Sequence, residues 1–160
     1  MSESAIAIAS NVTIMAYRFG DLIWSSSHKN HIGARGRTVV SQLLRGTTRL
    51  APRYIAVGTG TTAVGDSDLA LATEVFRRKV SRVVPMDDMV RYSLYVFEDE
   101  ANDLADFTEI GLFSGTKFED TDQEPLNGGR LFARALITPV SKDENTTLSI
   151  VWDIGVASAT

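Results

Sequence analysis

Apolar and polar residues alternate most regularly near the end of the chain. Every second position there is apolar, whereas the positions between are mixed: Leu148, Ile150, Trp152, Ile154 and Val156 alternate with Ser149, Val151, Asp153 and Gly155. A period of two sends successive side chains to opposite faces of a β-strand, so the pattern predicts a strand over 147–156 with one buried face. We expect Trp152 to lie in the core and Asp153 on the opposite face.

Four earlier segments are also rich in β-branched and aromatic residues and are separated by polar or glycine-containing loops. They are residues 80–84, 90–97, 107–113 and 131–137. A parallel α/β sheet would need a crossover after each strand, which this short spacing does not provide. The pattern therefore predicts a mainly β fold, an antiparallel β-sandwich or jelly roll with one or two short helices.

The middle of the chain is organised around one strand that runs into a tight turn. Residues 53–57 are predicted to be extended, and the glycines of Gly58-Thr59-Gly60 permit backbone angles that other residues avoid. Asp66 and Asp68 are candidate N-caps. They predict a short amphipathic helix over 69–76, which the basic run 77–79 ends.

The N-terminal third is predicted to contain strands and one helix. Residues 5–8 and 12–17 are expected to be extended, with 21–24 as a hairpin partner after Gly20. Residues 25–31 are interpreted as a polar loop. Apolar residues at helical spacing then predict a helix over 35–45, with Gly46 as its stop.

The composition is that of one soluble globular domain, with no sign of a membrane or nucleic-acid-binding protein. The 160 residues are 44% apolar, so we expect a single β domain over 1–160. The 16 basic and 20 acidic residues are dispersed along the chain and give a net charge of -4, without a basic patch for nucleic acid. No stretch approaches the roughly 18 apolar residues of a membrane span. The N-terminus lacks the basic start of a signal peptide.

Candidate ligand sites are sparse. The Gly58-Thr59-Gly60 turn lacks the Lys-Ser/Thr pair of a phosphate-binding Walker loop, so these glycines are interpreted as turn residues. His28 and His31 could share a metal ion, but the only near carboxylate is Asp21, and we interpret both as solvated loop histidines.

Two acidic connections, 98–103 and 117–125, are predicted to lie on the surface. In the second, Asp120, Asp122 and Glu124 alternate as Ca²⁺ ligands do, but the glycine and terminal glutamate of an EF-hand loop are missing. The chain has no cysteine and no nucleophile elbow, and two histidines in a loop suggest no catalytic triad. We therefore expect no enzyme and no catalytic, cofactor-binding or metal-binding residues.

Four segments occur in an order and spacing that carries a resemblance. They are residues 54–63 (YIAVGTGTTA), 68–75 (DLALATEV) with Arg77, 108–113 (TEIGLF) and 129–135 (GRLFARA). Together they resemble small structural proteins of tailed bacteriophages, of the tail-fibre and collar-fibre type. The resemblance covers residues 53–156, and its most specific piece is Glu109-Ile110-Gly111-Leu112-Phe113 followed by the strand over 131–135.

This resemblance implies a non-enzymatic structural subunit of a virion, placed in the tail, the baseplate or a fibre attachment. Capsid decoration is one alternative. Another is a receptor- or glycan-binding module, with Tyr17, Trp24 and Tyr95 as candidate exposed aromatics. The implied partners are other copies of the chain and other virion proteins. We expect a homo-oligomer in which residues 1–24 are an assembly arm or edge strands that pair with a neighbouring sheet.

Overall fold

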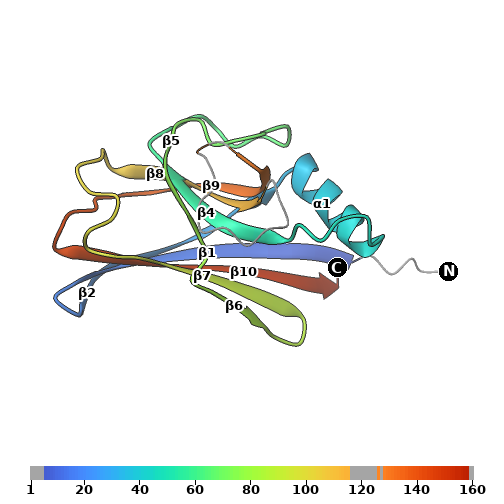
Figure 1. Cartoon of the computed structure of the whole chain (residues 1–160), viewed down its shortest axis with the longest axis horizontal. Helices are drawn as coiled ribbons and strands as arrows, with labels where there is room; N and C mark the ends of the chain where they lie inside the picture. The colour runs from blue at the N-terminus through green and yellow to red at the C-terminus, as the bar shows by residue number, and fades with distance from the viewer. Residues whose placement is uncertain (1–5, 116–125, 127, 159–160) are drawn as a thin grey trace.

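The computed structural model describes residues 6–115, 126 and 128–158, which form two antiparallel sheets and one helix (Figure 1). The first sheet has the order β2 (Asp21–Lys29), β1 (Ile6–Arg18), β10 (Thr146–Ser158), β7 (Met89–Val96), β6 (Arg82–Pro85). The second has the order β3 (His31–Ile32), β9 (Arg130–Val140), β8 (Phe107–Ser114), β4 (Pro52–Gly58), β5 (Glu74–Lys79). The predicted mainly β sandwich is therefore confirmed.

The chain passes directly from one sheet to the other at both sides of the sandwich. One crossing joins the end of β2 at Lys29 to the start of β3 at His31, and the other joins Lys79 of β5 to Arg82 of β6. Each crossing ties an edge of the first sheet to an edge of the second. The strand predicted over 80–84 is for this reason wrong in its bounds, because the chain changes sheet at Val80 and Ser81.

The core lies between the two sheets, and the alternation predicted for the last strand is confirmed as far as Trp152, whereas Val156 is 51% exposed. Leu148, Ile150 and Trp152 are at most 1% exposed, and the Trp152 indole N–H donates to Ser10 Oγ at 2.9 Å. Asp153 points to the outer face, where both of its oxygens accept hydrogen bonds from Arg91. Trp152 is thus a core residue, as predicted.

The predicted helix over 35–45 is confirmed as α1 (Ala34–Leu44), which packs against β9 through the buried Val39. The backbone turns away just after it, at Gly46, whose φ of 68° is a left-handed conformation that glycine adopts without a Cβ clash. Among the described residues no helix is long and apolar enough to cross a membrane.

The helix predicted over 69–76 is wrong. Residues 74–79 are β5, paired with β4, and residues 69–73 form an irregular segment. The Asp68 carboxylate accepts hydrogen bonds from the Gly65 N–H and from Arg134, so it does not cap a helix. The N–H groups of Ala72 and Thr73 instead donate to the side chain of Glu109.

The polar loop predicted over 25–31 is also wrong, because β2 continues to Lys29 and β3 begins at His31. Alternation explains the difference: Ser25 and Ser27 face solvent, whereas Ser26 and His28 are half-buried on the side that meets β9. A strand of small polar residues is stable here because its neighbours bond to those hydroxyls, as Thr13 does to Ser27 at 2.8 Å.

The hairpin predicted between 12–17 and 21–24 is confirmed as β1 and β2. From Asn11 to Arg18, β1 lies between β2 and β10, and Val12 and Ile14 are buried in the core. In the described part of residues 1–24, β1 is therefore an inner strand from Asn11 onward, and β2 is the edge strand of the first sheet. Residues 1–5 lie outside the described residues.

Candidate functional site

The most concentrated group of polar residues lies inside the second sheet, around Glu109. Glu109 on β8 and Arg134 on β9 occupy neighbouring strands, and their side chains are 0% and 3% exposed. One Glu109 oxygen, Oε2, accepts from Arg134 Nε at 3.1 Å and from Arg134 Nη2 at 2.8 Å. The pair is thus a buried, doubly bonded ion pair.

The Glu109 carboxylate also binds the backbone of the long connection between β4 and β5. Its Oε1 accepts from the N–H groups of Gly60 at 3.1 Å and Thr73 at 2.7 Å, and its Oε2 accepts from Ala72 at 3.0 Å. Gly60 lies so close that a Cβ there would be 2.5 Å from Glu109 Oε1. Glycine is therefore required at this position by contact with Glu109.

Arg134 completes the network on the other side of the connection. Its guanidinium donates to Asp68 Oδ2 at 2.8 Å and to the carbonyl oxygen of Thr62 at 2.8 Å. Burial raises the pKa of Glu109, but the N–H groups of Thr73 and Ala72 together with Arg134 outweigh that effect and hold the pKa below its ordinary value. A carboxylate that accepts five hydrogen bonds has no capacity left for acid–base chemistry.

A second buried ion pair lies nearby, and its side chains are also engaged in contacts within the fold. Arg77 donates to Glu74 Oε1 at 2.7 Å, both side chains are 0% exposed, and the guanidinium lies 3.9 Å above the ring of Phe113. Glu109 and Arg134 fix the connection after β4 onto the second sheet, whereas Arg77 binds Glu74 and the carbonyl oxygen of Gly128.

The two histidines do not form a metal site. His28 Nε2 accepts from the Thr138 N–H at 3.3 Å and bonds to Ser26 Oγ, and His31 Nε2 lies 2.9 Å from Asp66 Oδ1. Both lie on strands, so their interpretation as loop histidines is wrong. Within the described ranges no three His, Asp or Glu side chains are grouped as metal ligands require. The proposed Ca²⁺ ligands Asp120, Asp122 and Glu124 lie outside the described residues.

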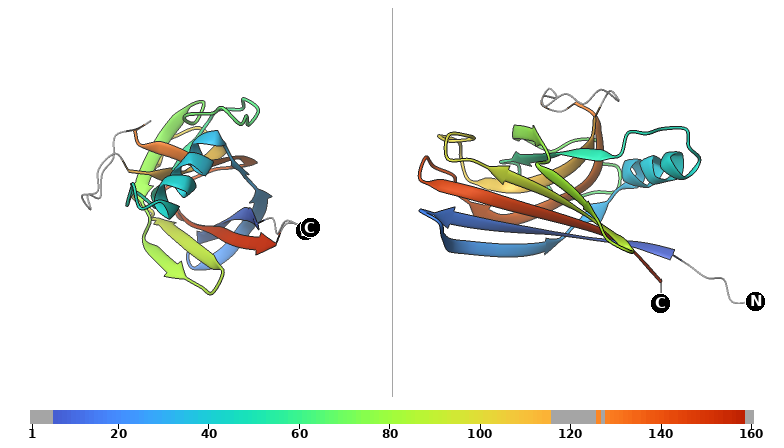
Figure 2. Two further views of the ribbon diagram at one scale, coloured as in Figure 1. Left: turned by 90° about the vertical axis from the view of Figure 1, so that its right-hand side faces the viewer. Right: turned by 60° about the horizontal axis from the view of Figure 1, so that its bottom comes forward.

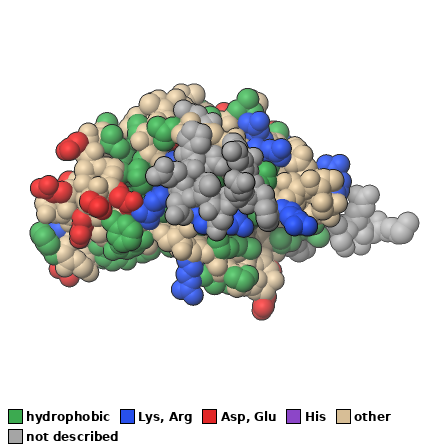
Figure 3. Space-filling view, in the orientation of Figure 1, with side chains coloured by type: hydrophobic (Ala, Val, Ile, Leu, Met, Phe, Trp, Pro, Cys, Tyr) green, Lys and Arg blue, Asp and Glu red, His purple; other side chains and the backbone are tan. Residues whose placement is uncertain are grey.

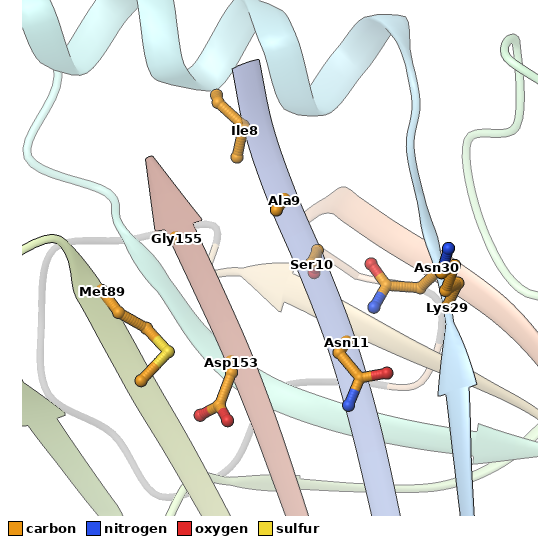
Figure 4. Close-up of a pocket in the computed structure, with 9 residues that line it drawn as sticks. All are labelled: Ile8, Ala9, Ser10, Asn11, Lys29, Asn30, Met89, Asp153 and Gly155. Carbon is orange, nitrogen blue, oxygen red and sulfur yellow. The ribbon is translucent and has the colours of Figure 1, made fainter. Parts of the chain in front are cut away.

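One hollow on the described surface lies where β2 ends beside β1 (Figure 4). It has a volume of about 680 Å³, and its lining comes from β1, β10, β7 and the end of β2. Its small residues, Ala9 and Gly155, form the floor, while Met89 and Lys29 stand at opposite sides. Its one carboxylate, Asp153, is bonded to Arg91, so the hollow contains no unengaged acid.

A second hollow, of about 340 Å³, lies at the tip of the β1–β2 hairpin and brings together two of the three candidate aromatics. Tyr17 and Tyr95 line it together with Phe19 and Glu98. The third candidate, Trp24, is half-buried against the core and lines a different hollow.

Phe19 is the residue of this tip that sequence reasoning missed. It has a φ of 50° and a side chain that is 81% exposed. A two-residue turn between strands favours Asn-Gly, because the first residue must adopt a left-handed conformation that is strained for a bulky side chain. The Phe19-Gly20 pair at the end of a predicted strand was the available signal.

Comparisons with models of known protein families, with curated proteins and with solved structures find no match for this chain. Function is therefore argued from the chain and its structure.

Proposed function

We propose that this protein is a non-enzymatic structural subunit of a bacteriophage virion, which assembles with copies of itself and with other virion proteins in a tail, baseplate or fibre attachment. One observation carries the proposal: large apolar side chains are exposed at both ends of the first sheet. At the hairpin end these are Phe19, Leu22 and Ile23, and at the other end Ile6 and Val156. Each is at least 51% exposed.

Apolar side chains grouped at the ends of one sheet are typical of surfaces that a neighbouring protein covers. Figure 3 shows hydrophobic side chains at the hairpin end, beside the acidic side chains of the neighbouring loops. The buried charged groups, in contrast, form ion pairs and hydrogen bonds within the fold, as Glu109 and Arg134 do. The exposed surface, rather than an internal site, is thus the part that is open to a partner.

The placement in a virion rests on the resemblance of residues 53–156 to tail-fibre and collar-fibre proteins. This placement can be tested by mass spectrometry of purified phage particles whose genome encodes the chain. Immunogold labelling would then locate the subunit in the particle. We expect the protein in stoichiometric amounts at the tail. Labelling over the capsid would favour decoration instead, and absence from intact particles would contradict the proposal.

A second candidate function, binding of a receptor saccharide, is favoured by the strained and exposed Phe19. The hairpin hollow combines aromatic rings with the hydroxyls of Thr147 and Ser149 and the carboxylate of Glu98, groups that can stack on a sugar ring and bond to its hydroxyls. Backbone strain in an exposed aromatic is typical of functional positions. Binding of neutral oligosaccharides on a glycan array by the wild-type chain, with loss in Phe19→Asn, would support this function.

A further inference from the structure

The first five described residues of β1 form an edge that no other described strand pairs with on the β2 side. β1 pairs with β10 along its whole length from Ile6, but β2 stops at Lys29, opposite Asn11. Figure 2 shows the start of β1 and the end of β10 running past the rest of the sandwich. We call residues 6–10 the free edge.

The backbone groups of the free edge that point away from β10 can be assigned from the other side of β10. The Val156 N–H donates to the carbonyl oxygen of Asp88 at 2.9 Å, away from β1, so Val156 and its partner Ile8 on β1 are not hydrogen-bonded to each other. Antiparallel strands alternate between residues that bond to one neighbour and residues that bond to the other. Ile6, Ile8 and Ser10 therefore present their N–H and C=O groups to the open side, whereas Ala7 and Ala9 bond to β10.

The free edge also lacks the features with which natural sheets block unwanted pairing. Those features are charged side chains, proline and very short strands. The edge strand β6 contains Arg82 and Pro85, β2 ends in Lys29, and β3 has two residues. Residues 6–10 have the sequence IAIAS, with no charge and no proline, and Ile6 is 74% exposed. An edge of this kind is suited to a partner strand.

A hollow flanks the free edge on each face of the sheet. The outer one is the 680 Å³ hollow of Figure 4, and the inner one, of about 350 Å³, is lined by Ile6, Ile8 and Ile32 among others. Ile8, Ser10 and Asn30 line both. Because alternate side chains of a strand point to opposite faces, a strand added here would place successive side chains in the two hollows.

We propose that the free edge pairs with the free edge of a second copy of this chain, antiparallel and about a two-fold axis at Ile8. This register places Ile8 opposite Ile8 of the partner subunit, and Ile6 opposite Ser10 of the partner subunit, as hydrogen-bonded pairs, and it joins the two first sheets into one continuous sheet. The inference rests on the proposed function, since it names the surface through which copies assemble.

The sequence of the free edge favours a copy of itself over an unrelated segment. About the two-fold axis, Ile8 meets Ile8 of the partner subunit and Ile6 meets Ser10 of the partner subunit, all on the inner face. Only the small alanines meet on the outer face, and no like charges are opposed. The one segment is complementary to itself, as an isologous interface requires.

The natural absence of cysteine makes a cross-linking test possible. Ile8 and Ile8 of the partner subunit form a hydrogen-bonded pair, whose Cα separation of about 5.5 Å suits a disulfide. We expect the Ile8→Cys variant to form a cross-linked dimer under mild oxidation. The control is Ser25→Cys, which places the thiol at an exposed position of the edge strand β2 and should remain monomeric.

A second change separates pairing from folding. Ile6→Pro removes an N–H that faces away from β10, so it should leave the melting temperature nearly unchanged but abolish cross-linking in the Ile8→Cys background. Equal cross-linking of both cysteine variants, or cross-linking that survives Ile6→Pro, would overturn the proposed register. If Ile8→Cys fails to cross-link while light scattering shows an oligomer, the free-edge proposal is wrong and the proposed function stands. A monomer at every concentration contradicts both.

Discussion

Arg134 on β9 holds one oxygen of Glu109 on β8 with two of its nitrogens, at 3.1 and 2.8 Å, at a point where both side chains are buried. Both side chains also form hydrogen bonds with backbone groups of residues 60–73. The irregular connection after β4 thereby becomes part of the second sheet's structure.

Loss of the Glu109 charge should destabilise the protein strongly. Glu109→Gln leaves Arg134 buried without its main counter-charge, and breaking a buried ion pair in this way costs about 3 to 5 kcal/mol. Urea unfolding followed by circular dichroism measures the loss. Asp153→Asn is the control, since its ion pair with Arg91 is partly exposed and should contribute less than about 1 kcal/mol.

The same carboxylate should make stability depend on acidic pH. The pKa of Glu109 is lower in the folded protein than its unfolded value of about 4.3, so the unfolded chain binds more protons between these two values. The stabilisation is complete above the unfolded pKa and is lost as pH falls through the folded pKa. Urea unfolding from neutral pH to about pH 3 should show a smaller loss in Glu109→Gln than in the wild type. Parallel curves would contradict this.

A methyl group at position 60 should disturb the network without removing any charge. The Cβ of Gly60→Ala would lie 2.5 Å from both Glu109 Oε1 and the Ala72 Cβ, and overpacking of this kind costs about 1 to 3 kcal/mol. The matched control is Gly65→Ala in the same connection, where the nearest atom to the added Cβ is 3.4 Å away. Thermal unfolding of the two variants compares them directly, and equal melting temperatures would refute the prediction.

Trp152→Ala should cost about 3 to 5 kcal/mol, because it removes a fully buried aromatic side chain from between the sheets. Chemical denaturation measures this, and assembly should be lost with folding. The neighbouring Asp153→Ala changes only the outer face and should be far better tolerated. An unchanged melting temperature for Trp152→Ala would show that the core does not depend on it.

Phe19→Asn should stabilise the hairpin while removing an exposed contact surface. Asn adopts the left-handed conformation of a two-residue turn more readily, so we expect the free energy of unfolding to rise by about 1 kcal/mol. If the saccharide-binding function holds, oligosaccharide binding is lost in the same variant. Leu44→Asn, an equally exposed apolar position on α1, is the control that should bind normally.

The periodicity of apolar residues predicted side-chain orientation correctly in the last strand up to Trp152, where one face is fully buried. It placed Trp152 inward and Asp153 outward, and it identified α1 with its stop at Gly46. These features depend on neighbours in the sequence or on the separation of core from solvent, both of which the chain shows directly.

Segment 69–76 could not be predicted in this way, because its local signals are those of a helix. Its conformation is decided by Glu109, which lies 36 residues beyond Thr73 and captures the N–H groups that a helix would use. The pair of Glu109 and Arg134 was not predicted, although each charged residue stands in an otherwise apolar strand. Their connection to Gly60 and Ala72 required the folded structure.

The pairing of Ile6 with Ser158 has a mechanical consequence for this subunit. The start of β1 and the end of β10 lie at the same end of the sandwich (Figure 1), so tension applied between them opens the ladder from that end. Hydrogen bonds between antiparallel strands are perpendicular to the strands, so they would break one after another rather than together. Such a load peels the two longest strands apart at low force, whereas tension along the strands loads many bonds at once. An assembly that carries tension through this subunit would therefore transmit it along the strands and not between the start of β1 and the end of β10.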